Sequence, residues 1–363
     1  MSFLNRVLEP PRFGYERNGK FYAPSLRELF SEFFYRFDLK RDRRNWLAVF
    51  GWWSSFILII PFFVYLFNYL SWGTFAWGFF YSMVIMGTHG TIWYHRYGTH
   101  RAYAFADNWA GRIARFVTRN LVIRIIPEET YVVSHHVHHA FSEEPGDPYN
   151  VNGGFWYCFL ADVTTQPIVK DLTPEEYQRL THMLAHTNGK VNSYEQYQKW
   201  GSLCHPAREF LHFGLNWAFW YGVFYWIGGH PVATASFGGA FTWAFGVRTF
   251  NFEGHGAGKD KHRDGIDFNR ADLSINQKWP GLITGEWHNN HHLYPNGARA
   301  GFLPMQWDYA WYYIKALSWV GLVSHYRDFT ADFFKNHYDP WVAKQRAFRA
   351  KAETPEVTVP AAP

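Results

Sequence analysis

The sequence contains very little cysteine. Of its 363 residues, only Cys158 and Cys204 carry a thiol. Two thiols are too few for a disulfide framework, and an iron–sulfur cluster or a rubredoxin-like site within the chain would need more. The count therefore excludes a disulfide-stabilised module and a built-in redox centre based on cysteine sulfur.

Charge is also absent from two long stretches of the chain. No Lys, Arg, Asp or Glu occurs between Arg44 and Arg96, and none between Glu209 and Arg248. The rest of the sequence is densely charged. This segregation favours one membrane-embedded unit over two soluble domains of ordinary size.

Each charge-free stretch is long enough for two transmembrane helices, because a bilayer core takes about 20 apolar residues per helix. The turn at residues 228–231 (Gly-Gly-His-Pro) cannot continue a helix and separates the second pair. We therefore expect an all-α integral membrane fold, a single domain over residues 1–363, with four transmembrane helices in two hairpins. The predicted spans are residues 48–70, 73–93, 210–227 and 232–249.

The basic residues predict how these helices are oriented. Both predicted hairpin turns lack Lys and Arg, whereas five basic residues precede the first span: Arg36, Lys40, Arg41, Arg43 and Arg44. Because Lys and Arg stay on the cytoplasmic side, both termini and everything outside the hairpins should be cytoplasmic. The net charge of +5 lies largely beside the apolar stretches, so we interpret it as topology and expect no nucleic-acid partner.

Two further segments have a distinctive composition. Residues 107–126 alternate apolar residues with four arginines, which suits a helix lying at the membrane interface. Residues 352–363 show no apolar periodicity, and we expect a disordered tail there.

Three histidine boxes occur on the predicted cytoplasmic side. His95 and His100 form an H-x-x-x-x-H box, and two H-x-x-H-H boxes follow at His135, His138 and His139 and at His288, His291 and His292. Helix positions i, i+3 and i+4 share one face, so each H-x-x-H-H box is expected to point three imidazoles toward one centre. His95 and His100 lie about 140° apart on an α-helix. They therefore reach different ions, or the helix ends between them.

Eight box histidines exceed the roughly four or five positions that one iron or zinc ion offers to side chains, so we expect two metal ions. Zinc has no redox chemistry, and iron with O2 better explains nitrogen-rich sites beside apolar hairpins. A non-catalytic membrane metal transporter would instead predict polar residues within the spans, which almost lack them. We assign no metal-binding role to the histidines outside the box spacing: His89, His136, His182, His186, His205, His212, His230, His262 and His325.

Further motifs accompany the boxes. They are Thr91 with the first box, Pro145-Gly146-Asp147-Pro148 and Gly154-Phe155 after the second, Asp272, Ser274, Asn276 and Gly285-Glu286 before the third, and then Trp307-Asp308 and Gly321-Leu322-Val323. From about Gly87 to about Val323 the chain thereby resembles the membrane fatty acid desaturase family, particularly its acyl-CoA Δ9-desaturase-like bacterial branch.

This resemblance implies a metal site and a shape. The family's Asn-x-x-x-His motif after the fourth span corresponds here to Asn251 and His255. The implied fold is a stem of four helices with a cytosolic helical cap that holds two iron ions, in a bacterial inner membrane. The implied ligands, with Asn251 acting through water, are His95, His100, His135, His138, His139, Asn251, His255, His288, His291 and His292.

The resemblance also implies a reaction, with O2 as co-substrate. We expect desaturation of a fatty acyl chain to a cis double bond, on an acyl-CoA, an acyl carrier protein, a lipid or a free fatty acid. Hydroxylation is one alternative, and oxidative decarboxylation of a free fatty acid to a terminal alkene is another. Arg248 motivates the latter as a substrate-binding residue, although a structural salt bridge to Glu253 is the simpler role. An external donor, ferredoxin or a cytochrome with its reductase, would dock on the cytosolic face. The basic stretch containing Lys259, Lys261 and Arg263 is either its docking site or a solvated loop.

Overall fold

The computed structural model of the chain describes residues 3–165, 167–255, 287–304 and 306–353. Several residues singled out from the sequence lie outside these ranges. They are the motif residues Asp272, Ser274, Asn276, Gly285 and Glu286, the basic stretch with Lys259, Lys261 and Arg263, His262, and the tail from residue 354 onward.

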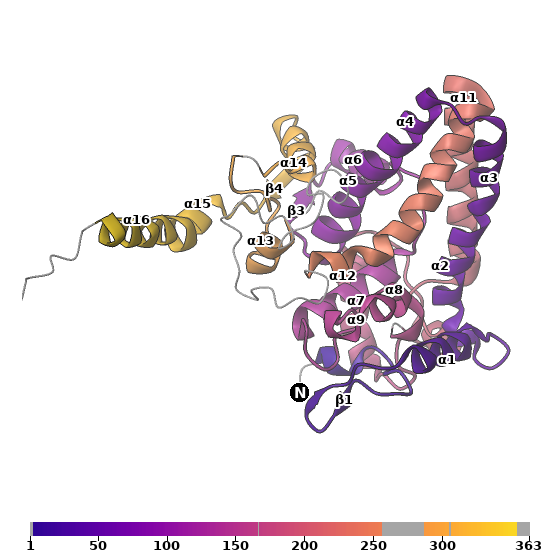
Figure 1. The fold of residues 1–363 in the computed structure, drawn as a ribbon. Helices are drawn as coiled ribbons and strands as arrows, with labels where there is room; N and C mark the ends of the chain where they lie inside the picture. Colours follow the sequence, from indigo (N-terminus) through magenta and orange to yellow (C-terminus); the bar gives the residue numbers. More distant parts are fainter. Residues whose placement is uncertain (1–2, 166, 256–286, 305, 354–363) are drawn as a thin grey trace, which may run out of the picture.

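The amino-terminal segment lies beneath the helices that follow (Figure 1). It contains η1 (Phe3–Arg6), the antiparallel pair β1 (Glu16–Arg17) and β2 (Lys20–Phe21), and α1 (Leu26–Phe37). Helix α1 begins at a capping box, in which Ser25 and Glu28 satisfy each other's backbone N–H groups. Its apolar face packs on α8 (Phe155–Thr164).

The first charge-free stretch forms a helical hairpin. The ascending arm contains η2 (Arg43–Asn45), α2 (Trp46–Ile57) and α3 (Ile59–Asn68). The descending arm contains α4 (Trp72–Phe80), the π-helix η3 (Tyr81–Met86), α5 (Gly87–His89) and a second π-helix, η4 (Gly90–Thr99). The predicted spans 48–70 and 73–93 fall on these two arms.

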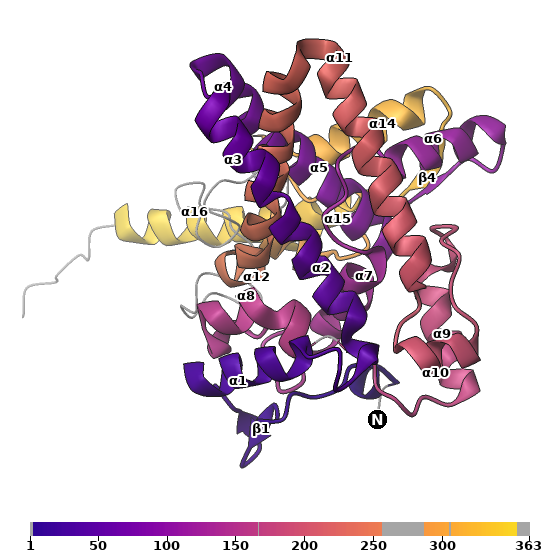
Figure 2. The same ribbon diagram turned by 90° about the vertical axis from the view of Figure 1, so that its right-hand side faces the viewer.

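The second charge-free stretch runs through α11 (Pro206–Gly246), η6 (Val247–Thr249) and α12 (Phe250–Gly254). Within α11 the backbone leaves helical geometry at Gly228 and Gly229, and Gly229 has a φ of +66°, which glycine adopts at little cost. The predicted break at residues 228–231 is confirmed. The two arms of α11 pack beside α3 and α4 (Figures 1 and 2).

Membrane insertion is supported only in part by the helices themselves. Within the described residues, one helical stretch, Arg43–Asn68, has both the length and the apolar composition to cross a membrane. Both hairpins nevertheless expose large apolar side chains, including Phe67, Trp72, Phe219 and Trp226. The topology with four spans therefore stays a prediction.

The remaining elements form a cap at one end of the hairpins. Between the hairpins lie β3 (Tyr103–Phe105), α6 (Trp109–Arg119), α7 (Glu128–Phe141), η5 (Val151–Gly153), α8, α9 (Pro174–Ala185) and α10 (Tyr194–Trp200). After the second hairpin come α13 (His288–Leu293), α14 (Tyr309–Trp319), β4 (Val323–Tyr326), α15 (Thr330–Phe333), the π-helix η8 (Phe334–Tyr338) and α16 (Asp339–Glu353), which extends away from the body (Figure 1).

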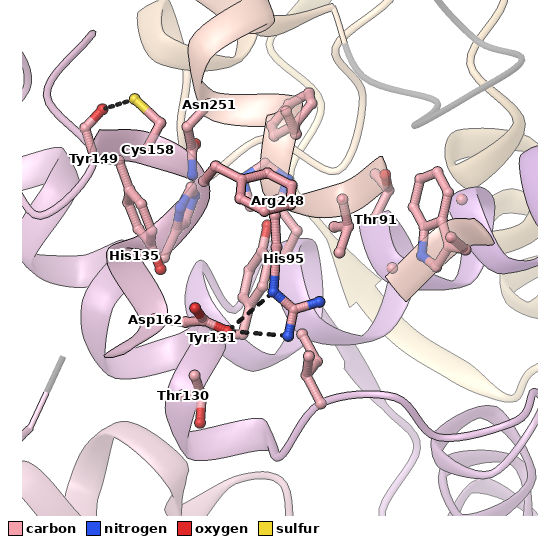
Figure 3. Close-up of a pocket in the computed structure, with 17 residues that line it drawn as sticks. Thr91, His95, Thr130, Tyr131, His135, Tyr149, Cys158, Asp162, Arg248 and Asn251 are labelled. Carbon is pink, nitrogen blue, oxygen red and sulfur yellow. Dashed lines mark hydrogen bonds and ion pairs between the residues drawn. The ribbon is translucent and has the colours of Figure 1, made fainter. Parts of the chain in front are cut away.

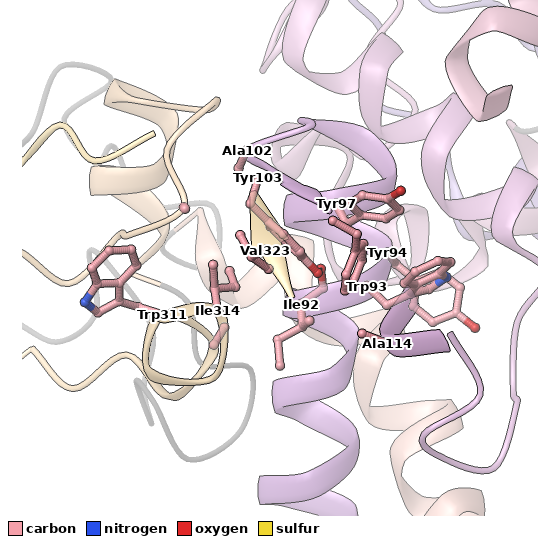
Figure 4. Packing of buried hydrophobic residues seen from close by; sticks show 13 residues of the cluster. Ile92, Trp93, Tyr94, Tyr97, Ala102, Tyr103, Ala114, Trp311, Ile314 and Val323 are labelled. Atoms are coloured by element: carbon pink, nitrogen blue, oxygen red, sulfur yellow. The ribbon is translucent and has the colours of Figure 1, made fainter. Parts of the chain in front are cut away.

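One core cluster ties the cap to the first hairpin. Strands β3 and β4 pair antiparallel, with Tyr103 opposite Tyr326, and join segments more than 200 residues apart. Figure 4 shows Ile92 and Trp93 of η4 beside Tyr103 of β3 and Ile314 of α14. This packing fixes η4, and so the first histidine box, against the cap. Helix α6 exposes Trp109, Ile113, Phe116 and Val117 while its arginines follow another face, in keeping with the interfacial helix expected there.

Candidate metal centre

The structure brings nine histidines into two groups. Within each group, the ring nitrogens that could bind a metal all lie within 4.8 Å of one another. Group one contains His95, His100, His135, His139 and His291; group two contains His138, His255, His288 and His292. These are the nine histidines of the expected ligand set, and His136 belongs to neither group.

The first box reaches a single group because η4 is a π-helix. The backbone N–H of His100 donates to the carbonyl of His95 at 3.1 Å, which is the i→i+5 hydrogen bond of a π-turn. This winding places residues five apart on one face. The two rings lie 4.9 Å apart between centroids, and both belong to group one. The two histidines therefore share one group, and η4 ends at Thr99, directly before His100.

The expectation that each H-x-x-H-H box points to one centre is wrong. In the second box His135 and His139 enter group one, whereas His138 enters group two. In the third box His288 and His292 enter group two, whereas His291 enters group one. Residues at i and i+4 lie about 40° apart on an α-helix, so they share a group, and the remaining histidine points aside to the other group. Each H-x-x-H-H box therefore bridges the two groups.

The arrangement of donor atoms fits two metal ions. The Nδ1–H of His138 donates to Asp147 at 2.8 Å, and the Nδ1–H of His255 donates to Glu143 at 2.8 Å. These bonds place the ring proton on Nδ1 and leave a lone pair on each Nε2. The two Nε2 atoms face each other at 3.2 Å. Two lone pairs at that distance repel each other unless a cation lies beside both.

The spacing of the nitrogens indicates the coordination. Along each group, successive Nε2 atoms lie between 2.9 and 3.2 Å apart. With metal–nitrogen bonds of about 2.1 Å, ligands at 90° lie about 3.0 Å apart and tetrahedral ligands about 3.4 Å apart. The nitrogens of each group therefore lie at distances that ligands of one metal ion can take.

Burial favours the neutral form of six of these imidazoles. Desolvation, followed by the electrostatic influence of neighbouring histidines, holds the pKa well below its usual value for His100, His135, His139, His288, His291 and His292. A neutral imidazole offers a lone pair at physiological pH, as a metal ligand must.

Asn251 belongs to a cavity that adjoins group one. Its Oδ1 is buried and finds no hydrogen-bond partner among the described residues. The cavity is lined by Asn251 and by His95 and His135 of group one (Figure 3). Its apolar lining residues include Trp243 and Phe159. An unsatisfied amide oxygen at this place suits a ligand that acts through water.

Arg248 lines the same cavity, but its partner differs from the simpler expectation. Glu253 is exposed, and the guanidinium instead forms an ion pair with Asp162 at 3.1 Å (Figure 3). The Arg248 side chain is only 5% exposed and stacks over the Trp52 ring at 4.5 Å. The Ser55 hydroxyl and the Ala244 and Gly51 carbonyls accept further hydrogen bonds from it. Protein groups therefore already satisfy this cation.

Sequence reasoning did not identify the carboxylates around the site. Asp147 stood within a quoted motif, but its role as the partner of His138 becomes visible only in the fold. Nothing in the sequence indicated that Glu143 and Asp162 belong to the site, because their partners His255 and Arg248 lie 112 and 86 residues further along the chain.

Comparison with known proteins identifies the family. The family model of the fatty acid desaturases matches residues 70–328. An icosanoyl-CoA 5-desaturase of Limnanthes douglasii is 27% identical over 263 residues, which cover 71% of this chain and 66% of the plant protein. An sn-1 stearoyl-lipid 9-desaturase of Synechocystis sp. is 27% identical over 344 residues, covering 87% and 95%. An acyl-CoA C20 Delta5-desaturase of Anemone leveillei is 26% identical over 269 residues, covering 70% and 74%.

The family model spans more than half of the chain and includes the first two histidine boxes, Asn251 with His255, and the third box. The names of these relatives include an acyl-CoA and an acyl-lipid substrate. They share desaturation of a fatty acyl chain and differ in chain length, double-bond position and headgroup. With its histidine groups able to hold metal, this chain belongs to the fatty acid desaturase family.

Proposed function

We propose that this protein is an integral membrane oxidoreductase that uses O2 and two iron ions to desaturate a fatty acyl chain. The observation that carries the proposal is the pair of buried histidine groups, one of which adjoins a largely apolar cavity. The nine histidines would hold the irons, five at one ion and four at the other, with Asn251 acting through water. Asp147 and Glu143 would orient His138 and His255.

Bound iron would supply the oxidising power that no side chain possesses, since an unactivated C–H bond resists acid–base groups. In the overall reaction, O2, two electrons and two protons convert –CH2–CH2– into –CH=CH– and two waters. The protein itself would contribute the positioning of the acyl chain. The apolar wall formed by Trp243, Phe159 and neighbouring residues would hold the chain in line with group one and exclude water.

Desaturation of an esterified chain is favoured over decarboxylation of a free fatty acid. Decarboxylation would use Arg248 to hold the substrate carboxylate, but Asp162 already neutralises this guanidinium. A second carboxylate at Arg248 would have to displace a buried partner. Hydroxylation shares the first hydrogen abstraction and remains the alternative outcome on the same chain.

The apolar surfaces of both hairpins support insertion in a membrane with four spans. Large exposed apolar side chains on an otherwise charged protein mark a surface that does not face water. We expect reporters fused at Ser71 and at Gly229 to be extracytoplasmic. Reporters at His136 and at the carboxyl end should be cytoplasmic, and an extracytoplasmic signal there would contradict the proposed topology.

Expression in a bacterial host of defined lipid composition tests the reaction. We expect about two irons per purified chain and, by mass spectrometry of lipids and free acids, a new double bond that requires O2 and reductant. His138→Ala should abolish the product and lower the iron content. His136→Ala, from the same helix but outside both groups, should retain both irons.

Several outcomes would contradict the proposal. A terminal alkene one carbon shorter than its precursor would show decarboxylation, and an alcohol would show hydroxylation. Iron binding without any change in lipid would favour the metal transporter considered from the sequence. Full activity with zinc alone would refute an iron-dependent reaction.

A further inference from the structure

A basic cleft lies beside group one and has no role in holding the metal or the acyl chain. Its walls come from η4, β3, α6, β4 and the end of α9. Its charged lining residues are Arg101, Arg112, Arg115, Arg327 and a single acid, Asp107. Within the described residues, Arg112 alone among these arginines forms an ion pair, with Asp107 at 3.2 Å. The cleft therefore keeps an excess of positive charge.

The floor of the cleft is close to group one. Arg101 directly follows His100, so their Cα atoms lie about 3.8 Å apart. Beside it, the Tyr97 hydroxyl donates to the carbonyl of His186 at 2.8 Å, and the His186 ring contacts Tyr97 at 5.0 Å between centroids. Tyr97 is only 4% exposed. A single turn of η4 thus separates the cleft from the metal-binding histidines.

The cleft is distinct from the acyl cavity, because the two have no lining residue in common. His95 lines the acyl cavity and Tyr97 lines the cleft, so η4 stands between them. A headgroup held in the cleft would have its acyl chain on the wrong side of η4. The cleft therefore does not suit the substrate.

The reaction requires a partner that fits this surface. Each O2 needs two electrons from outside, and the two cysteines of the chain cannot hold a redox cluster. Excess positive charge accelerates the encounter with an acidic partner and orients it. We propose that the Arg101–Arg112–Arg115–Arg327 cleft is the docking site of a small acidic electron-carrier protein, which delivers electrons to group one across η4. The inference rests on the proposed desaturase function.

Binding of a plant-type [2Fe–2S] ferredoxin, an acidic carrier, tests the site. The full chain in nanodiscs of neutral lipid is titrated with oxidised ferredoxin by calorimetry at low and high salt. Arg112 and Arg327 are exposed, so charge reversal should leave the fold intact. We expect R112E/R327E to weaken binding about tenfold or more at low salt and to flatten the salt dependence. The control R27E/K20E reverses two exposed cations of the amino-terminal segment and should bind as the wild type does.

Turnover separates docking from chemistry. With ferredoxin and its reductase, R112E/R327E should raise the KM for ferredoxin about tenfold, whereas product from a dithionite-driven single turnover should stay unchanged. Unaltered binding and KM would refute the docking site, and so would an equal loss with dithionite. Loss of binding to anionic vesicles with unchanged ferredoxin kinetics would assign the cleft to lipid. If wild type forms no product with dithionite, the proposed reaction fails, while the binding measurement still decides the docking surface.

Discussion

Asp147 is the carboxylate on which we expect group two to depend. It is fully buried, and its Oδ1 accepts hydrogen bonds from the Nδ1–H of His138 at 2.8 Å and from the backbone N–H of Tyr149 at 2.9 Å. Its Oδ2 accepts from the backbone N–H of Glu143 at 2.8 Å. Asn at this position offers only one oxygen. Whichever way the amide turns, its NH2 group then faces a donor.

The Asp147→Asn substitution should therefore weaken one metal site and spare the other. Loss of a carboxylate behind a metal-binding histidine lowers metal affinity about 10- to 100-fold, which corresponds to about 1.4–2.8 kcal/mol. The unsatisfied buried donor should lower the free energy of unfolding by a further 1–3 kcal/mol or so. Protein loaded with two irons is dialysed against increasing chelator, and iron per chain is measured by mass spectrometry. We expect a plateau near one iron per chain at chelator concentrations that leave the wild type fully loaded.

A matched substitution provides the control. Asp171→Asn makes the same chemical change at a carboxylate that is 80% exposed, and it should leave iron binding unaffected. The reasoning would be refuted if Asp147→Asn retained both irons with wild-type affinity. Simultaneous loss of both irons would refute the independence of the two groups.

Three further changes test other features. Replacing Arg248 by Lys removes one of the two nitrogens that contact Asp162. The free energy of unfolding in detergent should therefore fall by about 1–3 kcal/mol, and the product of the reaction should stay the same. An altered product with unchanged stability would contradict a structural role. In Gly98→Ala the new Cβ would lie 3.0 Å from the Trp93 carbonyl oxygen. This crowding should lower the free energy of unfolding by about 1–3 kcal/mol and should lower the iron content. Normal stability with normal iron content would refute the crowding. Burial raises the pKa of Glu129 from 4.5 to about 7, so its contribution to stability is fully present below about pH 4.5 and is lost as pH rises through 7. Glu129→Gln should remove of the order of 3 kcal/mol from that pH dependence, measured by denaturation at pH 4.5 and pH 8, and an unchanged dependence would refute the assignment.

The sequence predicted the large features that depend on local composition. Charge-free stretches place the hairpins, and the chain breaks at residues 228–231 because Gly229 has a positive φ and Pro231 lacks an N–H. Box spacing identified eight of the nine clustered histidines, and the family resemblance supplied His255. Their role as ligands stays a proposal, but their convergence is an observation.

Contacts between distant segments were beyond the reach of the sequence. The ion pair of Arg248 illustrates the reason. Glu253 was the near candidate, five residues further along the chain, yet Asp162 of α8 forms the pair because α8 packs against η6. Closeness in the sequence therefore favoured Glu253 over Asp162 as the partner of Arg248, and this was wrong.

The first histidine box shows how tertiary packing overrides local geometry. An α-helical winding would turn His100 away from His95, and only the π-helical η4 brings both to group one. No residue in the box by itself specifies a π-turn. Helix α7 packs closely against the π-helix at Gly98. A Cβ at this position would lie 3.3 Å from Val132 of α7 and 3.0 Å from the Trp93 carbonyl oxygen, so a larger residue would be crowded there. Glycine thus permits the close approach that places the first box against His135 and His139, so the metal-binding geometry depends on a residue that binds no metal.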